Sequence, residues 1–92
     1  MILLDAEKIT FYIERIRHNN LPITSDCIII ANDLLQLMTK YPNGLPDNYT
    51  FEFSKDLSET AIFDVFHMLA KKHPIIISEE EHTSVVLTDS LF

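Results

Sequence analysis

The chain of 92 residues has a single cysteine and a single glycine. Cys27 has no second cysteine to pair with, so an intramolecular disulfide framework is excluded and a reducing compartment is expected. Gly44 stands alone in a turn-rich segment, and one glycine cannot build the glycine-rich loop that holds phosphate groups. The sequence therefore predicts neither a disulfide-stapled scaffold nor a phosphate-binding loop.

Long apolar runs are also missing. The longest uninterrupted one, residues 27–31, is far shorter than the roughly 20 residues that a membrane-spanning helix needs. The opening "MILLDAEK" has too short an apolar run and no basic flank for a secretory signal. We therefore expect a cytoplasmic protein that makes no contact with a membrane.

Positive charge is scarce. Seven Lys and Arg stand against fourteen Asp and Glu, which gives a formal net charge of −7. Nucleic acids and anionic lipids attract basic surfaces, so this balance disfavours direct binding to DNA, RNA or a membrane surface. It favours a basic partner, although modest acidity also aids solubility and then needs no partner at all.

Apolar residues make up 47% of the chain. With this length, they predict a single domain over residues 1–92 with one compact core. Apolar residues recur at helical spacing in three segments, and they alternate with polar residues or form short β-branched runs in three others. We predict helices over 5–18, 25–40 and 57–72, and strands over 49–53, 75–78 and 83–87.

The order α-α-β-α-β-β predicts an α+β fold, with about three antiparallel strands and the helices packed on one face of the sheet. Helix starts are marked by Asp5, by Thr24 or Ser25, and by Asp56 with Glu59 at capping-box spacing.

The second helix carries more apolar surface than one core-facing stripe needs. Ile30 and Leu37 fall off that stripe and share a second face, seven residues apart. Either this helix is buried on two sides or the face meets another subunit. Ile30 and Leu37 therefore mark a possible homodimer face.

The segment "HPIIISEEEHTSVVLTD" places three consecutive glutamates between two expected strands. Calcium loops use alternating acidic ligands and a glycine, which are not found here, and Cys27, His67 and His73 have no short-range zinc spacing. Glutamates in a tight turn are also too exposed for acid–base chemistry, which needs carboxylates in different environments. We expect no metal, no cofactor and no enzymatic activity.

A helix followed by a hairpin has the shape of a winged-helix DNA reader, whose wing usually carries Lys or Arg. Here the hairpin tip carries the opposite charge, so charge display to a basic partner is the favoured interpretation. Carboxylates on one face of a helix or strand can approximate a row of phosphates, but any solvated acidic helix has similar spacing. The predicted contributors are Glu59, Asp64, Glu79, Glu80, Glu81 and Asp89.

The chain resembles the Arn anti-restriction family of T4-type bacteriophages. The resemblance extends over the whole length and includes the opening "DAEKITFYIERIRHNNLP" and the acidic "SEEEH" near the end. It implies a non-enzymatic phage inhibitor in the host cytoplasm, a DNA mimic that occupies the DNA-binding surface of host proteins. The implied targets are the modification-dependent restriction endonuclease McrBC and the histone-like nucleoid protein H-NS. The modest net charge departs from the most acidic DNA mimics.

Two other functions fit the same sequence. One is an immunity protein or antitoxin that neutralises a basic nuclease toxin. The other is a small regulatory interaction domain that uses the face formed by Ile30 and Leu37.

Overall fold

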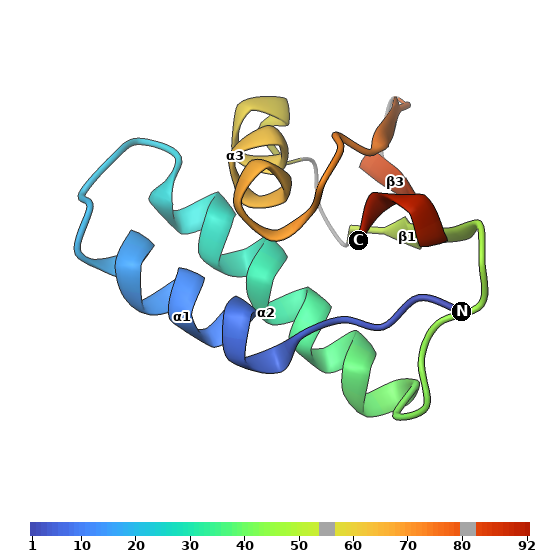
Figure 1. Cartoon of the computed structure of the whole chain (residues 1–92). Coiled ribbons are helices and arrows are strands. Elements are labelled where there is room, and N and C mark those ends of the chain that lie inside the picture. Colours follow the sequence, from blue (N-terminus) through green and yellow to red (C-terminus); the bar gives the residue numbers. More distant parts are fainter. Residues whose placement is uncertain (54–56, 80–82) are drawn as a thin grey trace.

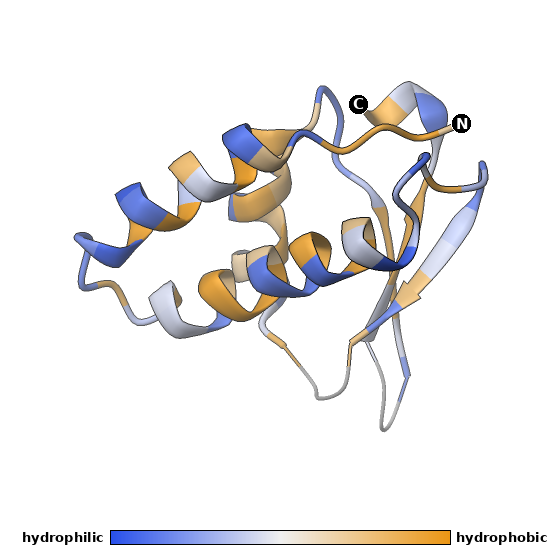
Figure 2. Cartoon of the chain, turned by 90° about the horizontal axis from the view of Figure 1, so that it is seen from below, coloured by the Kyte–Doolittle hydropathy of each residue, from blue (hydrophilic) through white to orange (hydrophobic). Residues whose placement is uncertain are grey.

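The computed structural model describes residues 1–53, 57–79 and 83–92 of the chain. Its elements follow the predicted order α-α-β-α-β-β, so the α+β fold class is confirmed (Figure 1). The helices form one layer and the strands a second (Figure 2). The element bounds are Ala6–Arg17 for α1, Thr24–Lys40 for α2, Tyr49–Glu52 for β1, Glu59–Leu69 for α3, Ile75–Ser78 for β2, Thr83–Leu87 for β3, and Asp89–Leu91 for the closing 3-10 turn η1.

Helix α1 begins where its sequence predicts. Asp5 is the N-cap, and its carboxylate accepts a hydrogen bond from the backbone N–H of Lys8 at 3.2 Å. Such a cap satisfies a donor at the free end of the helix and is worth about 1 kcal/mol. The buried face of α1 consists of Ile9, Tyr12, Ile13 and Ile16. It packs against α2, which runs in the opposite direction (Figure 1).

Helix α2 is buried on two sides. Ile30 is 0% exposed and Leu37 is 6% exposed, and both belong to the core of this same chain. The prediction of a dimer face at these two residues is therefore wrong, because α2 packs against both α1 and α3. A regulatory domain that binds a partner through Ile30 and Leu37 is not supported for the same reason, because both side chains are buried. The predicted cap is also wrong, since the N-cap position is held by Ile23, whose side chain accepts no hydrogen bond.

Helix α3 is shorter than its apolar pattern predicts. It begins at Glu59, after Ser58 in extended geometry, and it ends at Leu69 because Ala70 is also extended. The backbone N–H of Lys71 then donates to the carbonyl oxygen of Leu91 at 2.7 Å, which ties this turn to the end of the chain. Asp56, the first residue of the predicted capping box, lies outside the described residues.

The sheet has the strand order β1-β3-β2, and both pairings are antiparallel. Side chains of alternate residues point to opposite faces, so Thr83, Val85 and Leu87 of β3 share the buried inner face. On the outer face, Ile75 of β2 is 65% exposed and Ile77 is 40% exposed. Strand β3 is therefore central, while β1 and β2 form the edges of the sheet as far as the structure describes it.

One hydrophobic core joins the two layers. Buried residues of all three helices belong to the same cluster as Phe53, Val85 and Leu87 from the sheet region. Across residues 1–53, 57–79 and 83–92, no helix is both long enough and apolar enough to cross a membrane.

Candidate partner-binding surface

Hydrogen bonds join the segments that carry three acidic residues, Asp26 in α2, Glu59 in α3 and Glu79 just after β2. Ser78 Oγ, at the end of β2, donates a hydrogen bond to Glu59 Oε1 of α3 at 3.1 Å. Glu79 is the next residue along the chain. The backbone N–H of Ser58 donates to Asp26 Oδ2 of α2 at 3.2 Å, which brings Asp26 to the start of α3. We call Asp26, Glu59 and Glu79 the acidic edge.

Local physics explains why these acidic residues are at element ends. Asp26 and Glu59 lie in the first turns of α2 and α3. The free N–H groups and the macrodipole of a helix favour an anion there. Glu79 directly follows β2, and its side chain is exposed. The fold therefore collects charge where two helices begin and one strand ends.

The acidic edge is not neutralised within the part of the chain that the structure describes. The Lys and Arg residues described there form one side-chain ion pair, between Arg17 and Glu14 at 3.6 Å. This pair lies on α1, and both of its side chains are 59% exposed. The carboxylates of Asp26, Glu59 and Glu79 thus keep their negative charge available to a partner.

Two of the six carboxylates predicted from the sequence belong to this edge. Glu59 and Glu79 are the predicted members, and Asp26 is a member that the prediction did not include. Glu80 and Glu81, which follow Glu79 in the sequence, lie outside the described residues.

Asp64 has a different environment. Its Oδ2 accepts a hydrogen bond from the Tyr12 hydroxyl of α1 at 2.7 Å, and the Cys27 thiol of α2 lies 3.9 Å from the same oxygen. Burial raises the pKa of the Tyr12 hydroxyl, so that group stays protonated and donates. Burial also raises the pKa of the Cys27 thiol, which lies in the core. Asp64 therefore joins three helices and does not belong to the acidic edge.

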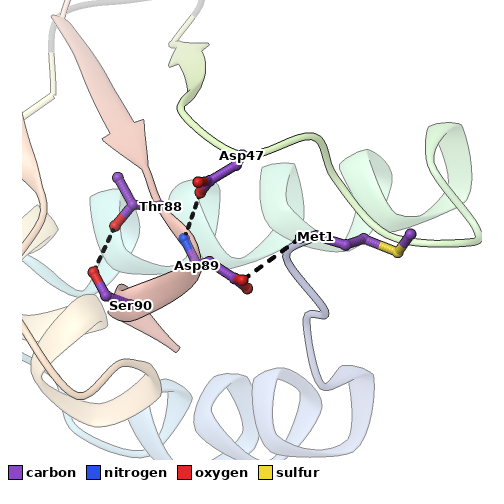
Figure 3. Close-up of polar contacts among 5 residues, drawn as sticks. All are labelled: Met1, Asp47, Thr88, Asp89 and Ser90. Atoms are coloured by element: carbon purple, nitrogen blue, oxygen red, sulfur yellow. Dashed lines mark hydrogen bonds and ion pairs between the residues drawn. The ribbon is translucent and has the colours of Figure 1, made fainter.

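Asp89 lies beyond the far end of β3, a strand about 13 Å long. Figure 3 shows its contacts: its backbone N–H donates to Asp47 Oδ1 at 2.8 Å, and its carboxylate is 3.6 Å from the amino group of Met1. Thr88 and Ser90 hold the same turn through a 3.2 Å hydrogen bond between their hydroxyls. Because β3 separates it from Glu79, Asp89 cannot extend the acidic edge.

A groove of about 550 Å³ lies between α2 and β1. The pKa of Asp33, on the α2 side, is raised by burial of its carboxylate. The α2 wall consists of Asp33, Gln36, Leu37 and Lys40, and the β1 wall of Tyr49, Thr50, Phe51 and Glu52. The sequence predicted both elements but not that a groove separates them.

No metal centre is formed among the described residues, since no group of three or more His, Cys, Asp or Glu is arranged to hold an ion there. No protein-family model, curated protein or solved structure matches the chain. The functional interpretation therefore depends on the geometry and charge of the surfaces described above.

Proposed function

We propose that this protein is a non-enzymatic inhibitor that acts as a DNA mimic, by presenting the acidic edge to the DNA-binding surface of a basic protein. One observation carries the proposal. Hydrogen bonds join the start of α3 to Asp26 and to Ser78, the residue before Glu79, and none of the three acidic residues forms an ion pair with a Lys or Arg among the described residues.

Carboxylates can take the place of phosphates on a surface that binds DNA. Phosphates of duplex DNA follow each other at about 3.4 Å of axis along each strand. The two hydrogen bonds, at 3.2 and 3.1 Å, join the start of α3 to Asp26 and to the residue before Glu79. A guanidinium or ammonium group that reads phosphate can pair with a carboxylate through the same charge-assisted hydrogen bonds.

Affinity for such a partner is expected to be electrostatic. The net charge of −7 steers the protein toward a basic groove, and ions released from both surfaces add to the binding free energy. Binding should therefore weaken as salt rises, because exposed charges separated by more than about 8 Å are screened at physiological ionic strength.

Competition with DNA is the direct test. H-NS and McrBC, the targets that the resemblance to the Arn family implies, are each bound to a fluorescent duplex, and the anisotropy of the duplex is followed as this protein is added. The duplex is expected to be released. A ternary complex that retains the duplex, or no binding to any basic DNA-binding protein, would contradict the proposal.

Matched variants connect the competition to the acidic edge. The double variant Glu59→Gln/Glu79→Gln loses two charges from the edge, and Glu7→Gln/Glu14→Gln loses two charges from α1. If each edge carboxylate contributes about 0.5–1 kcal/mol, the first variant competes about five- to thirtyfold more weakly. The second variant has the same net charge as the first but keeps the acidic edge intact, so it should compete like the parent protein. Equal weakening by both variants would show that net charge matters and the edge does not.

A further inference from the structure

Strand β1 has an unpaired edge. Among the described residues it pairs with β3 only, and the backbone N–H of Phe53, which follows it, donates to the carbonyl oxygen of Thr83 at 3.0 Å. Antiparallel ladders alternate between hydrogen-bonded and non-hydrogen-bonded pairs, so Phe51 also bonds toward β3. The backbone N–H and C=O groups of Thr50 and Glu52 consequently point away from β3. They are free to accept another strand.

Helix α2 runs beside this edge and forms the other wall of the groove. The Tyr41 ring, just after α2, makes an edge-to-face contact with the Tyr49 ring at 5.4 Å between centroids. From that contact β1 runs past α2 at a wide angle to the helix axis (Figures 1 and 2). The α2 wall from Asp33 to Lys40 is about 10 Å long, close to the length of β1. A groove of about 550 Å³ is within the usual size range of ligand sites.

We propose that this groove binds an extended basic segment of a partner protein, which joins the sheet as a strand beside β1. Two observations specify the occupant. The free backbone groups of Thr50 and Glu52 require an extended chain, because only a strand places its own donors and acceptors at matching spacing. The carboxylates of Asp33 and Glu52 outnumber the ammonium group of Lys40 among the charged residues of the walls.

The added strand would contact both layers. Its side chains alternate between the helical side, where the partly buried Phe51 offers apolar surface, and the solvent side, where Glu52 projects. A Lys or Arg on the helical side meets Asp33, while one on the solvent side meets Glu52. Lys40 lies near the Tyr49 end of the groove, so the opposite end is the more negative one and favours the basic residue there.

This inference goes beyond the proposed function, because it concerns a second surface and a different kind of contact. The acidic edge would interact with phosphate-reading side chains, whereas the groove would bind backbone. The DNA competition uses duplex DNA and the test below uses none. Either of them can therefore fail while the other succeeds.

The test starts from a library of random heptapeptides displayed on phage and selected against the whole chain at low salt. Enriched peptides are expected to contain Lys or Arg. One of them, synthesised with blocked ends, is titrated into ¹⁵N-labelled protein. The largest shifts are expected at the amides of Thr50 and Glu52 and along the Asp33–Lys40 face of α2.

Single N-methylation along the bound peptide examines strand addition without altering the protein. Only alternate N–H groups of an added strand face β1, so methylation at every second position should weaken binding about tenfold and the intervening positions should change little. On the protein side, Asp33→Asn should weaken binding about two- to fivefold. The matched variant Glu7→Gln, on the exposed side of α1, should leave the affinity unchanged.

Any one of the following four results would overturn the inference, and a fifth is given after them. They are a selection that enriches no peptide, enriched peptides that are acidic, an N-methyl scan without the two-residue alternation, and shifts that map to the acidic edge instead of the groove. Shifts at Thr50 and Glu52 that depend on protein concentration alone would assign the groove to a second copy of this chain, and so would also refute it.

Discussion

The contribution of the hydrogen bond between Tyr12 and Asp64 to stability can be predicted quantitatively. This bond joins α1 to α3 through residues that are 52 positions apart in the sequence. Tyr12 is 5% exposed, and its hydroxyl donates to the carboxylate at 2.7 Å. The variant Tyr12→Phe removes this donor and keeps the ring that fills the core. It therefore tests the hydrogen bond with little change in packing.

The expected cost follows from the surroundings of the two groups. A hydrogen bond to a charged group contributes about 1.5–3 kcal/mol to stability. Asp64 is only partly buried, so water can replace part of the lost interaction and the lower end of that range applies. For a domain of 92 residues, a loss of about 1.5 kcal/mol corresponds to a fall in Tm of about 6–12 °C.

A double-mutant cycle isolates the interaction from side effects of each substitution. Unfolding free energies are measured by urea denaturation for the parent, Tyr12→Phe, Asp64→Ala and the double variant. We expect a coupling energy of about 1–1.5 kcal/mol. A coupling below about 0.5 kcal/mol would mean that the two groups act independently, and the structural role assigned to Asp64 would be wrong. In the DNA competition, Asp64→Ala should match the parent protein.

Four further predictions follow from particular residues. Burial raises the pKa of Asp33 above its ordinary value of 3.8, so its ionised form opposes folding. Asp33→Asn should therefore be more stable than the parent at neutral pH, and thermal melts should show this advantage shrinking as pH falls through the raised pKa and gone below 3.8. Ile30→Val should lower the unfolding free energy by about 0.5–1.5 kcal/mol and leave the sedimentation mass unchanged at every concentration, whereas loss of a dimer would restore the dimer-face interpretation. Gly44→Ala should destabilise the fold by about 1–2 kcal/mol in urea, because φ is +109° at Gly44 and an added Cβ would lie 3.1 Å from the backbone oxygen of Ile2. Glu59→Gln should lower both stability and partner affinity, and Glu79→Gln should lower affinity alone.

The order and type of the elements could be predicted because apolar periodicity records which side of each segment is buried. The ends of a helix or strand were harder to predict where a contact with a residue distant in the sequence determines them. Lys71 and Lys72 suit the last turn of a helix, yet α3 ends at Leu69 because the chain turns there to bond with Leu91. That bond joins residues whose proximity is a product of the tertiary fold, so a local pattern does not contain it.

The candidate surface shows the same difference between what a local sequence pattern predicts and what only the tertiary fold determines. Spacing placed Glu59 and Asp64 on the polar side of one helix, and only the packing of α1 shows that Tyr12 reaches Asp64. Similarly, alternation predicted β1 as a strand, but whether a strand is central or at an edge depends on pairing that local alternation does not encode. In the strand order β1-β3-β2, β1 is an edge strand, and it borders the groove beside α2.

Two physical explanations account for the acidic edge: one concerns the stability of the fold, and the other concerns affinity for a partner. Asp26 and Glu59 lie in first turns, where interaction with the helix macrodipole stabilises an anion by about 0.3–1 kcal/mol whether or not a partner exists. Glu79 follows a strand, and strands have only a small net dipole, so its charge gains no comparable stabilisation. Neutralising a carboxylate that stabilises the fold lowers the unfolding free energy, whereas neutralising one that contacts a partner lowers the affinity for that partner. Loss of affinity in Glu79→Gln without loss of stability is therefore the result that separates charge display from helix capping.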